Sequence, residues 1–345
     1  MPNIRDAITI TSTVAASASA TQWAVPAIVG VSGATAKNTP KSFKSLTSVK
    51  TEHGDSSAIS AGAKAMFDAG VKEIYTVSVD MASTSPTAAE IETALATLVN
   101  YVSSGSIQGV ALAGITDLDS LAKLKAFADA NRVIFVATHA ENETVSNIVT
   151  AAASLKSENG CFVAYKGLPS SNPDDVACAV LGAIMLREPY FTLAWMPVQV
   201  NVDEYFNPTD LATLEAGRVN AIIYQKSQNQ LSNGLSLDSD VPFLDTTRMK
   251  YYIESLIRDS IADSRISAKN IPYTQKGFEA IKGWIGTPLE QLRRNNFIES
   301  YSVTIPKVED ISTANQASRK ITGIVVTVQT ISDVQEFSMN LNIEV

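Results

Sequence analysis

The chain contains few of the residues on which enzyme chemistry most often depends. Its 345 residues include only two cysteines and two histidines. Cys161 lies in an apolar strand pattern and Cys178 in an apolar helical pattern, so we predict two buried, reduced thiols; a disulfide between them is the less favoured alternative. His53 and His139 are too few to serve a serine or cysteine triad without other support, and no GxSxG motif is present.

Charge is also scarce. Charged residues make up 18% of the chain, and the formal net charge is −8. Basic residues do not cluster beyond Arg293 and Arg294, which we interpret as the end of a helix. Because a phosphate backbone is bound by a basic stripe, this composition argues against a nucleic-acid-binding protein.

Long apolar runs are absent from the sequence. No segment approaches the roughly 20 uninterrupted apolar residues that cross a bilayer, and the first residues lack the apolar core of a signal peptide. We therefore expect a protein that is made and folded in a cytoplasm, without membrane insertion. Hydrophobic residues at 45% indicate a folded chain rather than a disordered one.

Glycine-rich phosphate-binding turns are missing as well. Neither GxGxxG nor GxxxxGK[ST] follows any expected strand, so no nucleotide cofactor is predicted. The nearest approach to a metal site is His139, Glu141 and Glu143, but one histidine with this spacing matches no zinc or diiron pattern. We interpret the two glutamates as the acidic first turn of a helix. The alternative is a ligand-binding or hydrolytic α/β enzyme with its site here.

Two further groups could form a site. Asp174 and Asp175 could pair as acid and base, but the second and third positions of a helix after an asparagine cap explain them without catalysis. Tyr190, Phe191 and Trp195 could line an aromatic pocket, although core packing between a helix and a strand is the favoured interpretation.

Residues 22–225 show helices that alternate with short, continuously apolar strands. This pattern predicts crossover units and a mainly parallel sheet that is covered on both faces, an α/β three-layer sandwich. The expected strands are the segment that starts at Trp23, then 73–79, 108–113, 132–138 and 161–167. The expected helices are 57–70, 86–103, 117–130, 141–157 and one that begins at 172–175, followed by a helix that starts at Asn207 and ends at Gly217 before a final strand.

The last third of the chain changes character. Long helical patterns cover 244–266 and 274–294, and a strand pattern covers 297–305. We expect an α+β domain over 226–320, followed over 321–345 by a terminal hairpin, in which strands 321–331 and 334–345 join at Ser332 and Asp333.

Both ends of the chain carry the alternation of a half-buried strand. The N-terminal arm, residues 1–14, is followed by the small polar tether AASASAT; arm and tether together cover 1–21. The C-terminal arm is residues 334–345. A lone strand is stable only when it is docked on an existing sheet, and that sheet can belong to the same molecule or to another one. The apolar residues expected to make these contacts are Ile8, Ile10, Val14, Phe337, Met339, Leu341, Ile343 and Val345.

Three stretches resemble the sheath proteins of contractile phage tails and related contractile injection systems. They are AVPAIVGVSGATAKNTPKSFKSLTSVKTEHG with the following SAISAGAKAMFDAGVKEIYTVSV, LEAGRVNAIIY with DTTRMKYYIESLIRDSI, and the segment from NFIESYSVTI to the end. Only the architecture of the centre, about 85–200, adds to this resemblance. The chain is too short for the large surface insertions of bigger sheath proteins.

The resemblance implies a non-enzymatic structural subunit, without cofactors. Its partners would be copies of itself in hexameric rings that stack helically, an inner tail tube protein, and baseplate and tail terminator proteins. The N- and C-terminal arms would each add a strand to the sheets of neighbouring subunits, and contraction would rearrange subunits that stay linked through these arms. Such a protein would be found in a virion tail or an extracellular contractile particle that is assembled in the host cytoplasm. A different tail component, such as a tube or baseplate protein, is a further alternative, although tube proteins are usually small β-barrels.

Overall fold

A computed structural model describes residues 24–83, 85–169, 175–268 and 271–331. Both predicted arms lie outside these ranges, and so do all the predicted arm residues: Ile8, Ile10, Val14, Phe337, Met339, Leu341, Ile343 and Val345. The second strand of the expected terminal hairpin also lies outside them.

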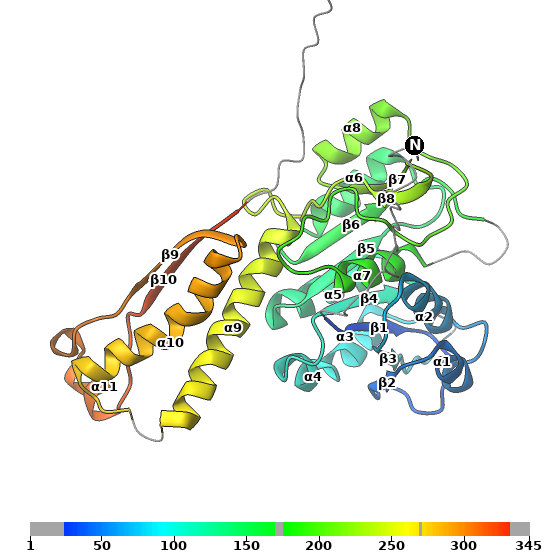
Figure 1. The fold of residues 1–345 in the computed structure, drawn as a ribbon. Coiled ribbons are helices and arrows are strands. Elements are labelled where there is room, and N and C mark those ends of the chain that lie inside the picture. Colours follow the sequence, from blue (N-terminus) through cyan, green and yellow to red (C-terminus); the bar gives the residue numbers. More distant parts are fainter. Residues whose placement is uncertain (1–23, 84, 170–174, 269–270, 332–345) are drawn as a thin grey trace, which may run out of the picture.

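An eight-stranded sheet forms the larger part of the fold, with the strand order β2-β3-β1-β4-β5-β6-β7-β8 (Figure 1). The neighbours from β3 to β7 pair in parallel, whereas β2 and β8 pair antiparallel at the two edges. The mainly parallel sheet predicted from the sequence is therefore confirmed. The strands are β1 (Pro26–Gly30), β2 (Lys41–Phe43), β3 (Ile74–Ser78), β4 (Gly109–Ala113), β5 (Ile134–Thr138), β6 (Gly160–Ala164), β7 (Asn220–Gln225) and β8 (Gln228–Leu231).

Helices pack on both faces of this sheet. One apolar cluster joins α1, α2 and α7 to one face, and a second joins α3, α5, α6 and α8 to the other. In β1, Ile28 belongs to the first cluster and its neighbours Ala27 and Val29 to the second, which explains why central strands are apolar throughout. The helices are α1 (Leu46–His53), α2 (Ala58–Ala69), α3 (Ala88–Ala96), α4 (Val99–Ser103), α5 (Leu118–Asn131), α6 (Val145–Ser154), α7 (Val176–Leu186) and α8 (Pro208–Ala216).

Three of these helices begin later than the sequence patterns predict. The N-caps of α3, α6 and α7 are Thr87, Thr144 and Asp175, and each side chain accepts a hydrogen bond from the backbone N–H three residues further on. A cap that bonds the third helical N–H sets the start of a helix locally. The expected helix 86–103 is also divided, since α3 ends before Thr97 and α4 follows.

A second, smaller assembly follows β8. It contains α9 (Leu244–Ala268), α10 (Gln275–Arg294), β9 (Ile298–Thr304), a 3-10 turn (Val308–Asp310), α11 (Thr313–Ala317) and β10 (Val325–Thr330). β9 and β10 form a separate antiparallel sheet, and α9 lies between the large sheet and α10 (Figure 1). α10 ends at Arg294, as predicted for the arginine pair. Of the helices that the structure describes, none is long and apolar enough to cross a membrane.

Candidate functional site

His139 follows β5 and is 5% exposed. Its Nδ1 lies 2.6 Å from the Ala140 carbonyl oxygen, and its Nε2 accepts the backbone N–H of Tyr165 at 3.2 Å. A carbonyl can only accept and an N–H can only donate, so this histidine is neutral and protonated on Nδ1. Burial lowers its pKa, and the ring stacks on Tyr165. With both nitrogens in use, His139 has no free ring nitrogen for a metal or a substrate.

The two acidic residues near His139 do not complete a site. Glu141 and Glu143 precede the N-cap Thr144, so their interpretation as the first turn of a helix is wrong. Glu143 accepts a hydrogen bond from the side chain of Asn147 at 2.9 Å. Within the described ranges, no group of three or more histidine, cysteine, aspartate or glutamate side chains could hold a metal ion.

The other histidine lies in a buried polar cluster at the end of α1. His53 is 3% exposed; its Nδ1 lies 2.8 Å from Ser32 Oγ and its Nε2 lies 2.7 Å from Thr76 Oγ1. The hydroxyl of Ser32 donates to Ser78 Oγ at 2.9 Å, so it accepts from His53 rather than giving up a proton to it. Despite the short distance, Ser32 and His53 are therefore not a nucleophile and its base, and both side chains are buried.

This cluster makes the stability of the protein depend on pH. Burial, assisted by Lys41 and Lys37 and opposed by Glu52, lowers the pKa of His53 from 6.5 to about 4. Between pH 6.5 and about 4, His53 is therefore protonated in the unfolded chain but remains neutral in the folded chain. The free energy of unfolding is therefore unaffected by His53 above pH 6.5 and decreases as the pH falls towards about 4. The total decrease is at most about 3 kcal/mol.

We expect the free energy of urea unfolding to fall between pH 6.5 and pH 4, and to fall less steeply in His53→Gln. An NMR titration of the imidazole signals provides the direct measurement. A His53 signal that titrates near pH 6.5 in the folded protein would contradict the prediction.

Asp175 is a structural cap rather than half of an acid–base pair. Its carboxylate accepts the N–H of Cys178 at 2.9 Å and the N–H of Gly114 at 3.0 Å, so it joins the start of α7 to the turn after β4. It is the N-cap itself, so its predicted place inside the helix is wrong. Asp174 lies outside the described residues.

Both cysteines are free and buried, which confirms the prediction of two structural thiols. Burial raises the pKa of Cys161 to about 12 and that of Cys178 well above its ordinary value. Since the thiolate is the reactive form, neither residue is suited to nucleophilic chemistry.

The aromatic segment after α7 differs from the expectation. Phe191 and Trp195 are 44% and 45% exposed, so the prediction that they pack in the core is wrong. Leu193 and Met196 fill the core instead, and Trp195 takes a left-handed backbone conformation that turns it outward. Tyr190 stacks on Phe297 with ring centroids 3.6 Å apart, and so connects this segment to the start of β9.

The two-stranded sheet has one apolar and one polar face. Half-buried side chains point towards the two helices, and exposed polar side chains point away from them. Because the register pairs residues of the same face across the two strands, this division is regular. The inner residues are Tyr301, Val303, Val326 and Val328, and the outer ones include Ser300, Ser302, Thr304, Thr327 and Gln329.

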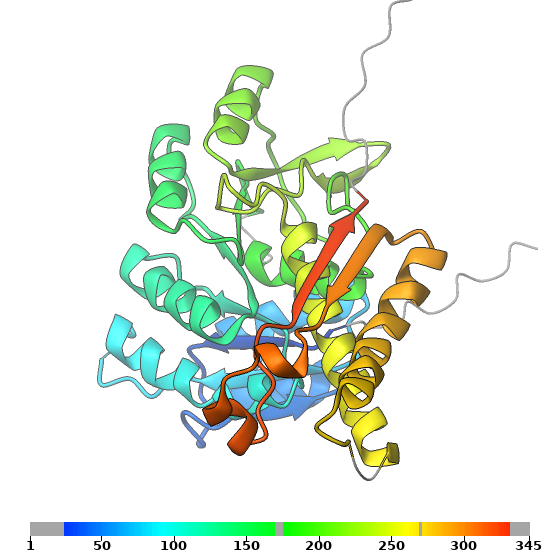
Figure 2. The ribbon, with the colours of Figure 1, turned by 90° about the vertical axis from the view of Figure 1, so that its left-hand side faces the viewer.

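The sheet is narrower than the helix pair beneath it. Two strands at a spacing of about 4.8 Å cover about 10 Å, whereas two packed helices present about 20 Å. In the described part of the chain, neither outer edge of this sheet is paired with another strand, and Figure 2 shows β9 and β10 side by side in front of α9 and α10. A groove remains on each side.

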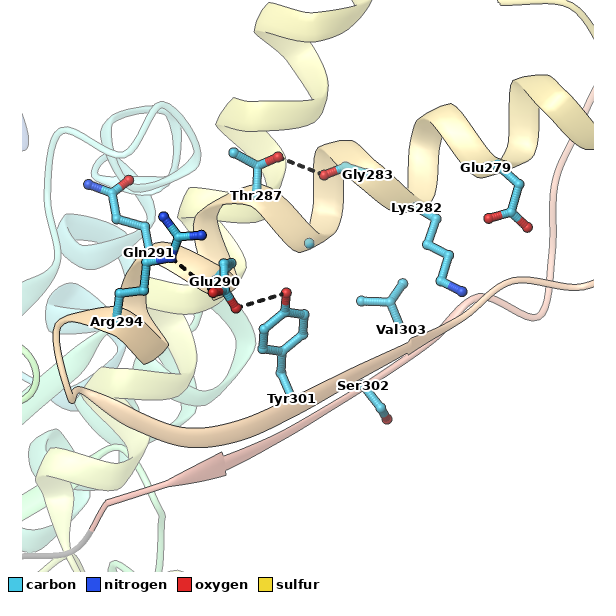
Figure 3. A pocket seen from close by; sticks show the side chains of 11 residues that line it. Glu279, Lys282, Gly283, Thr287, Glu290, Gln291, Arg294, Tyr301, Ser302 and Val303 are labelled. Atoms are coloured by element: carbon cyan, nitrogen blue, oxygen red, sulfur yellow. Dashed lines mark hydrogen bonds and ion pairs between the residues drawn. The ribbon is translucent and has the colours of Figure 1, made fainter.

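The α10 groove lies between α10 and β9 and has a volume of about 910 Å³ (Figure 3). Tyr301 and Val303 point into it from β9, and Ser302 points away. On the helix side, a Cβ at Gly283 would meet nothing within 4 Å, and one at Gly286 would meet only Tyr301, at 3.8 Å. The helix surface is therefore open to the close approach of another backbone.

The walls of the α10 groove are charged. Glu290 pairs with Arg293 at 2.8 Å and with Arg294 at 2.9 Å, and these two guanidinium groups lower the pKa of Glu290 to about 2. Glu279 and Lys282 line the groove further along α10. An apolar side chain placed here would desolvate charges.

The α9 groove lies between α9 and β10, has a volume of about 770 Å³, and is mainly apolar. Ile253, Ile257 and Ile261 recur at every fourth residue of α9, which places them on one side of the helix. Across the groove they face Val326 and Val328 of β10. This groove is therefore mainly apolar and lies beside an edge of β10 that pairs with no other strand among the described residues.

The first half of α9 is bound to the large sheet by polar contacts. Thr247 donates to the carbonyl of Glu158 at 2.9 Å, and Lys250 pairs with the carboxylate of the same glutamate at 2.8 Å. The Tyr251 hydroxyl lies 2.5 Å from Asn159 Oδ1. These contacts fix α9 against the turn before β6.

Arg248 makes the most deeply buried of these attachments. It is 6% exposed, and its Nη2 donates to the carbonyl oxygens of Ile184 at 3.0 Å and Arg187 at 2.5 Å, at the end of α7. A cation at a helix C-terminus is favourable there, but burial still lowers its pKa to about 10. The sequence analysis did not predict the buried role of Arg248. The helical spacing of Leu244, Arg248 and Tyr251, which places all three on the inward side of α9, could have indicated it.

Comparisons with known proteins give matches only at the level of structure. No model of a protein family matches the chain, and no curated protein does. Two solved structures of the anti-feeding prophage baseplate match, one six-fold symmetrised and one in the contracted state. The first matching chain is 15% identical with a TM-score of 0.72 and the alignment covers 98% of both chains; the second is 14% identical with a TM-score of 0.67 and 97% of both covered.

The crystal structure of a sheath tail protein from Desulfitobacterium hafniense also matches. It is 10% identical, has a TM-score of 0.63, and aligns over 94% of this chain and 100% of the other. Identities this low show the fold alone. The resemblance to the contractile tail sheath family that the sequence suggested is thus confirmed at the level of the fold, along almost the whole chain.

Proposed function

We propose, from the sheath tail fold that this chain has, that the protein is a structural subunit of a contractile tail sheath. It polymerises as hexameric rings that stack around an inner tube. The observation that supports this most directly is the two-stranded sheet with an open edge and a groove on each side. Such edges promote aggregation in a monomer but serve as connecting sites in a polymer.

Neighbouring subunits are joined by strand addition. The N-terminal arm (1–14) and the C-terminal arm (334–345) each add a strand to the two-stranded sheet of another copy, through Ile8, Ile10 and Val14 and through the alternating apolar residues of the C-terminal end. Two added strands would widen that sheet from about 10 Å to about 19 Å, which matches the width of the helix pair.

The domain division follows from this role. Residues 1–21 are the arm and its tether, 22–225 the three-layer α/β body, 226–320 the α+β sheath domain, and 321–345 the terminal hairpin with its arm. During contraction the bodies rearrange while the exchanged strands stay paired, so the stored energy lies in contacts between bodies that differ in the two states.

The partners are other copies of the chain, an inner tail tube protein, and baseplate and tail terminator proteins, in a virion tail or an extracellular contractile particle. The matches to structures of a baseplate support a place for some copies beside the baseplate. An enzymatic role near His139 is not favoured, because both of its ring nitrogens are already engaged in hydrogen bonds with the backbone.

Negative-stain microscopy of the purified full-length protein tests this function. We expect long hollow cylinders, because a chain with two arms and two acceptor edges can link without limit. Dispersed globules at every concentration and ionic strength would contradict the proposal.

A further inference from the structure

We propose that residues 283–288 form a hinge in α10, and that a hydrogen bond from Ser260 on α9 holds this hinge closed. Such a hinge works within a single chain, so it goes beyond the proposed function and does not depend on it. Its support comes from the residues of this part of α10, from the contact that Ser260 makes, and from the different attachments of the two halves of the helix.

Pro288 interrupts the hydrogen bonding of α10. Proline has no backbone N–H, so Pro288 cannot donate to the carbonyl oxygen of Trp284 four residues earlier, and its ring presses against that carbonyl. The hydroxyl of Ser260 donates to the same carbonyl oxygen at 2.8 Å. A side chain of α9 thus supplies the donor that α10 lacks.

Ser260 lies among apolar residues where the two helices meet. Leu256 precedes it by one turn on the same side of α9, and Ile257 and Ile261 pack against the cluster that contains Ile285 of α10. A hydroxyl in apolar surroundings costs free energy unless it is hydrogen-bonded. The bond to Trp284 therefore explains why a polar residue is stable at this position.

The same six residues weaken α10 in other ways. In the described part of the chain, a Cβ at Gly283 would meet nothing within 4 Å, and one at Gly286 would meet only Tyr301, at 3.8 Å, so packing requires neither glycine. Glycine makes a helix interior less stable than alanine does. The hydroxyl of Thr287 donates to the carbonyl of Gly283 at 2.8 Å, a contact that often bends helices (Figure 3).

The half of α10 before the hinge is attached to the segment that connects β9 to β10. Phe278 is 1% exposed and packs edge-on against Tyr273, whose hydroxyl donates to the carbonyl of Lys320 at 3.1 Å. The side-chain oxygen of Gln275 accepts the backbone N–H of Val308 at 3.3 Å. This half and the connecting segment are therefore expected to move together.

The half of α10 after the hinge is attached to the first half of α9. Leu289 and Leu292 belong to an apolar cluster with Met249 and Ile253, close to the part of α9 that is fixed to the large sheet. Ile281, just before the hinge, is partly buried against the same cluster, so opening would expose it and the closed state is favoured.

Opening of the hinge would move the connecting segment relative to the large sheet. About ten residues of α10 precede the middle of the hinge, a length of about 15 Å. A bend of about 20°, as found at proline kinks, would displace the start of α10 by about 5 Å. The second half of α10 would stay in place.

Hydrogen exchange of the full-length protein, read at single-residue level by mass spectrometry, tests the hinge. Ser260→Ala removes the donor, and we expect the amides of residues 284–291, whose hydrogen bonds cross the hinge, to exchange about ten times faster. The amides of residues 279–282, which lie within the first half, and those of α5 should keep their rates.

Pro288→Ala restores an N–H to α10, and it tests whether Ser260 acts through the missing donor. In this background Ser260→Ala should change exchange at residues 284–291 by less than about twofold, because the restored N–H binds the Trp284 carbonyl. Ser264→Ala is the matched control, since Ser264 is also half-buried and lies one turn further on the same side of α9.

Three results would each overturn the proposal. The first is unchanged exchange at residues 284–291 in Ser260→Ala, or the same increase in Ser264→Ala. The second is an equal increase along all of α10 or in α5, which would mean that the bond only adds to general stability. The third is an equal effect of Ser260→Ala with and without Pro288.

Discussion

Deletion of residues 334–345 is expected to leave a folded protein that forms no cylinders, and deletion of residues 1–14 is expected to have the same result. Burial of the five apolar side chains of the C-terminal arm would gain about 8–15 kcal/mol, and ordering of its backbone would cost about 9–18 kcal/mol. Because the two terms nearly cancel, the arm contributes little to the stability of its own subunit. Its loss therefore removes connections between subunits and leaves the fold intact.

Circular dichroism and urea unfolding measure the fold of these variants, and negative-stain microscopy measures assembly. Two matched substitutions test whether assembly needs the apolar face of the arm and not only its length. Leu341→Asp places a negative charge on the apolar face, and Asn342→Asp places the same charge on the polar face. We expect the first to prevent cylinders and the second to permit them. Cylinders formed by the doubly truncated protein would contradict strand exchange.

The substitution Arg248→Ala is expected to lower the free energy of unfolding by about 2–4 kcal/mol. It leaves the Arg187 carbonyl without the guanidinium that it binds, which costs about 1–3 kcal/mol, and it removes one of two hydrogen bonds to the Ile184 carbonyl, which keeps the backbone N–H of Arg187 and loses about 1 kcal/mol. The large effect arises because Arg248 is 6% exposed, so water does not simply replace the lost donor.

Arg258→Ala provides the control, since Arg258 lies on the same helix but is exposed. Urea unfolding of both variants at one pH is the measurement, and the control should stay within about 0.5 kcal/mol of the unchanged protein. If Arg248→Ala and Arg258→Ala are equally stable, Arg248 does not attach α9 to the large sheet.

Much of the large sheet could be predicted because its strands are buried on both faces. The apolar run 108–113 became β4 (Gly109–Ala113) and 132–138 became β5 (Ile134–Thr138). The short strand β2 and helix α1 were missed, because neither has a strong apolar pattern. β2 is three residues long and pairs with β3, and α1 is held through Val49 and the buried contacts of His53.

The grooves beside the two-stranded sheet could not be predicted from the sequence. The helical period of α9 was visible, but nothing in it shows that Ile253, Ile257 and Ile261 would face β10, whose residues lie far away in the sequence. The outward turn of Trp195 is equally non-local, since its backbone N–H binds the carbonyl of Leu231. Such features depend on contacts between distant segments, which a single sequence does not encode as a local pattern.

The continuity of α9 has a mechanical consequence. Its 25 residues form one helix of about 37 Å, fixed to the large sheet through its first two turns and bearing the two-stranded sheet along the rest. It can therefore act as a lever with its fulcrum at Arg248. The part of the helix beyond Arg248 is about 30 Å long, so a tilt of about 10° would move its far end by about 5 Å. A small repacking near Arg248 thus becomes a displacement comparable with the spacing between strands.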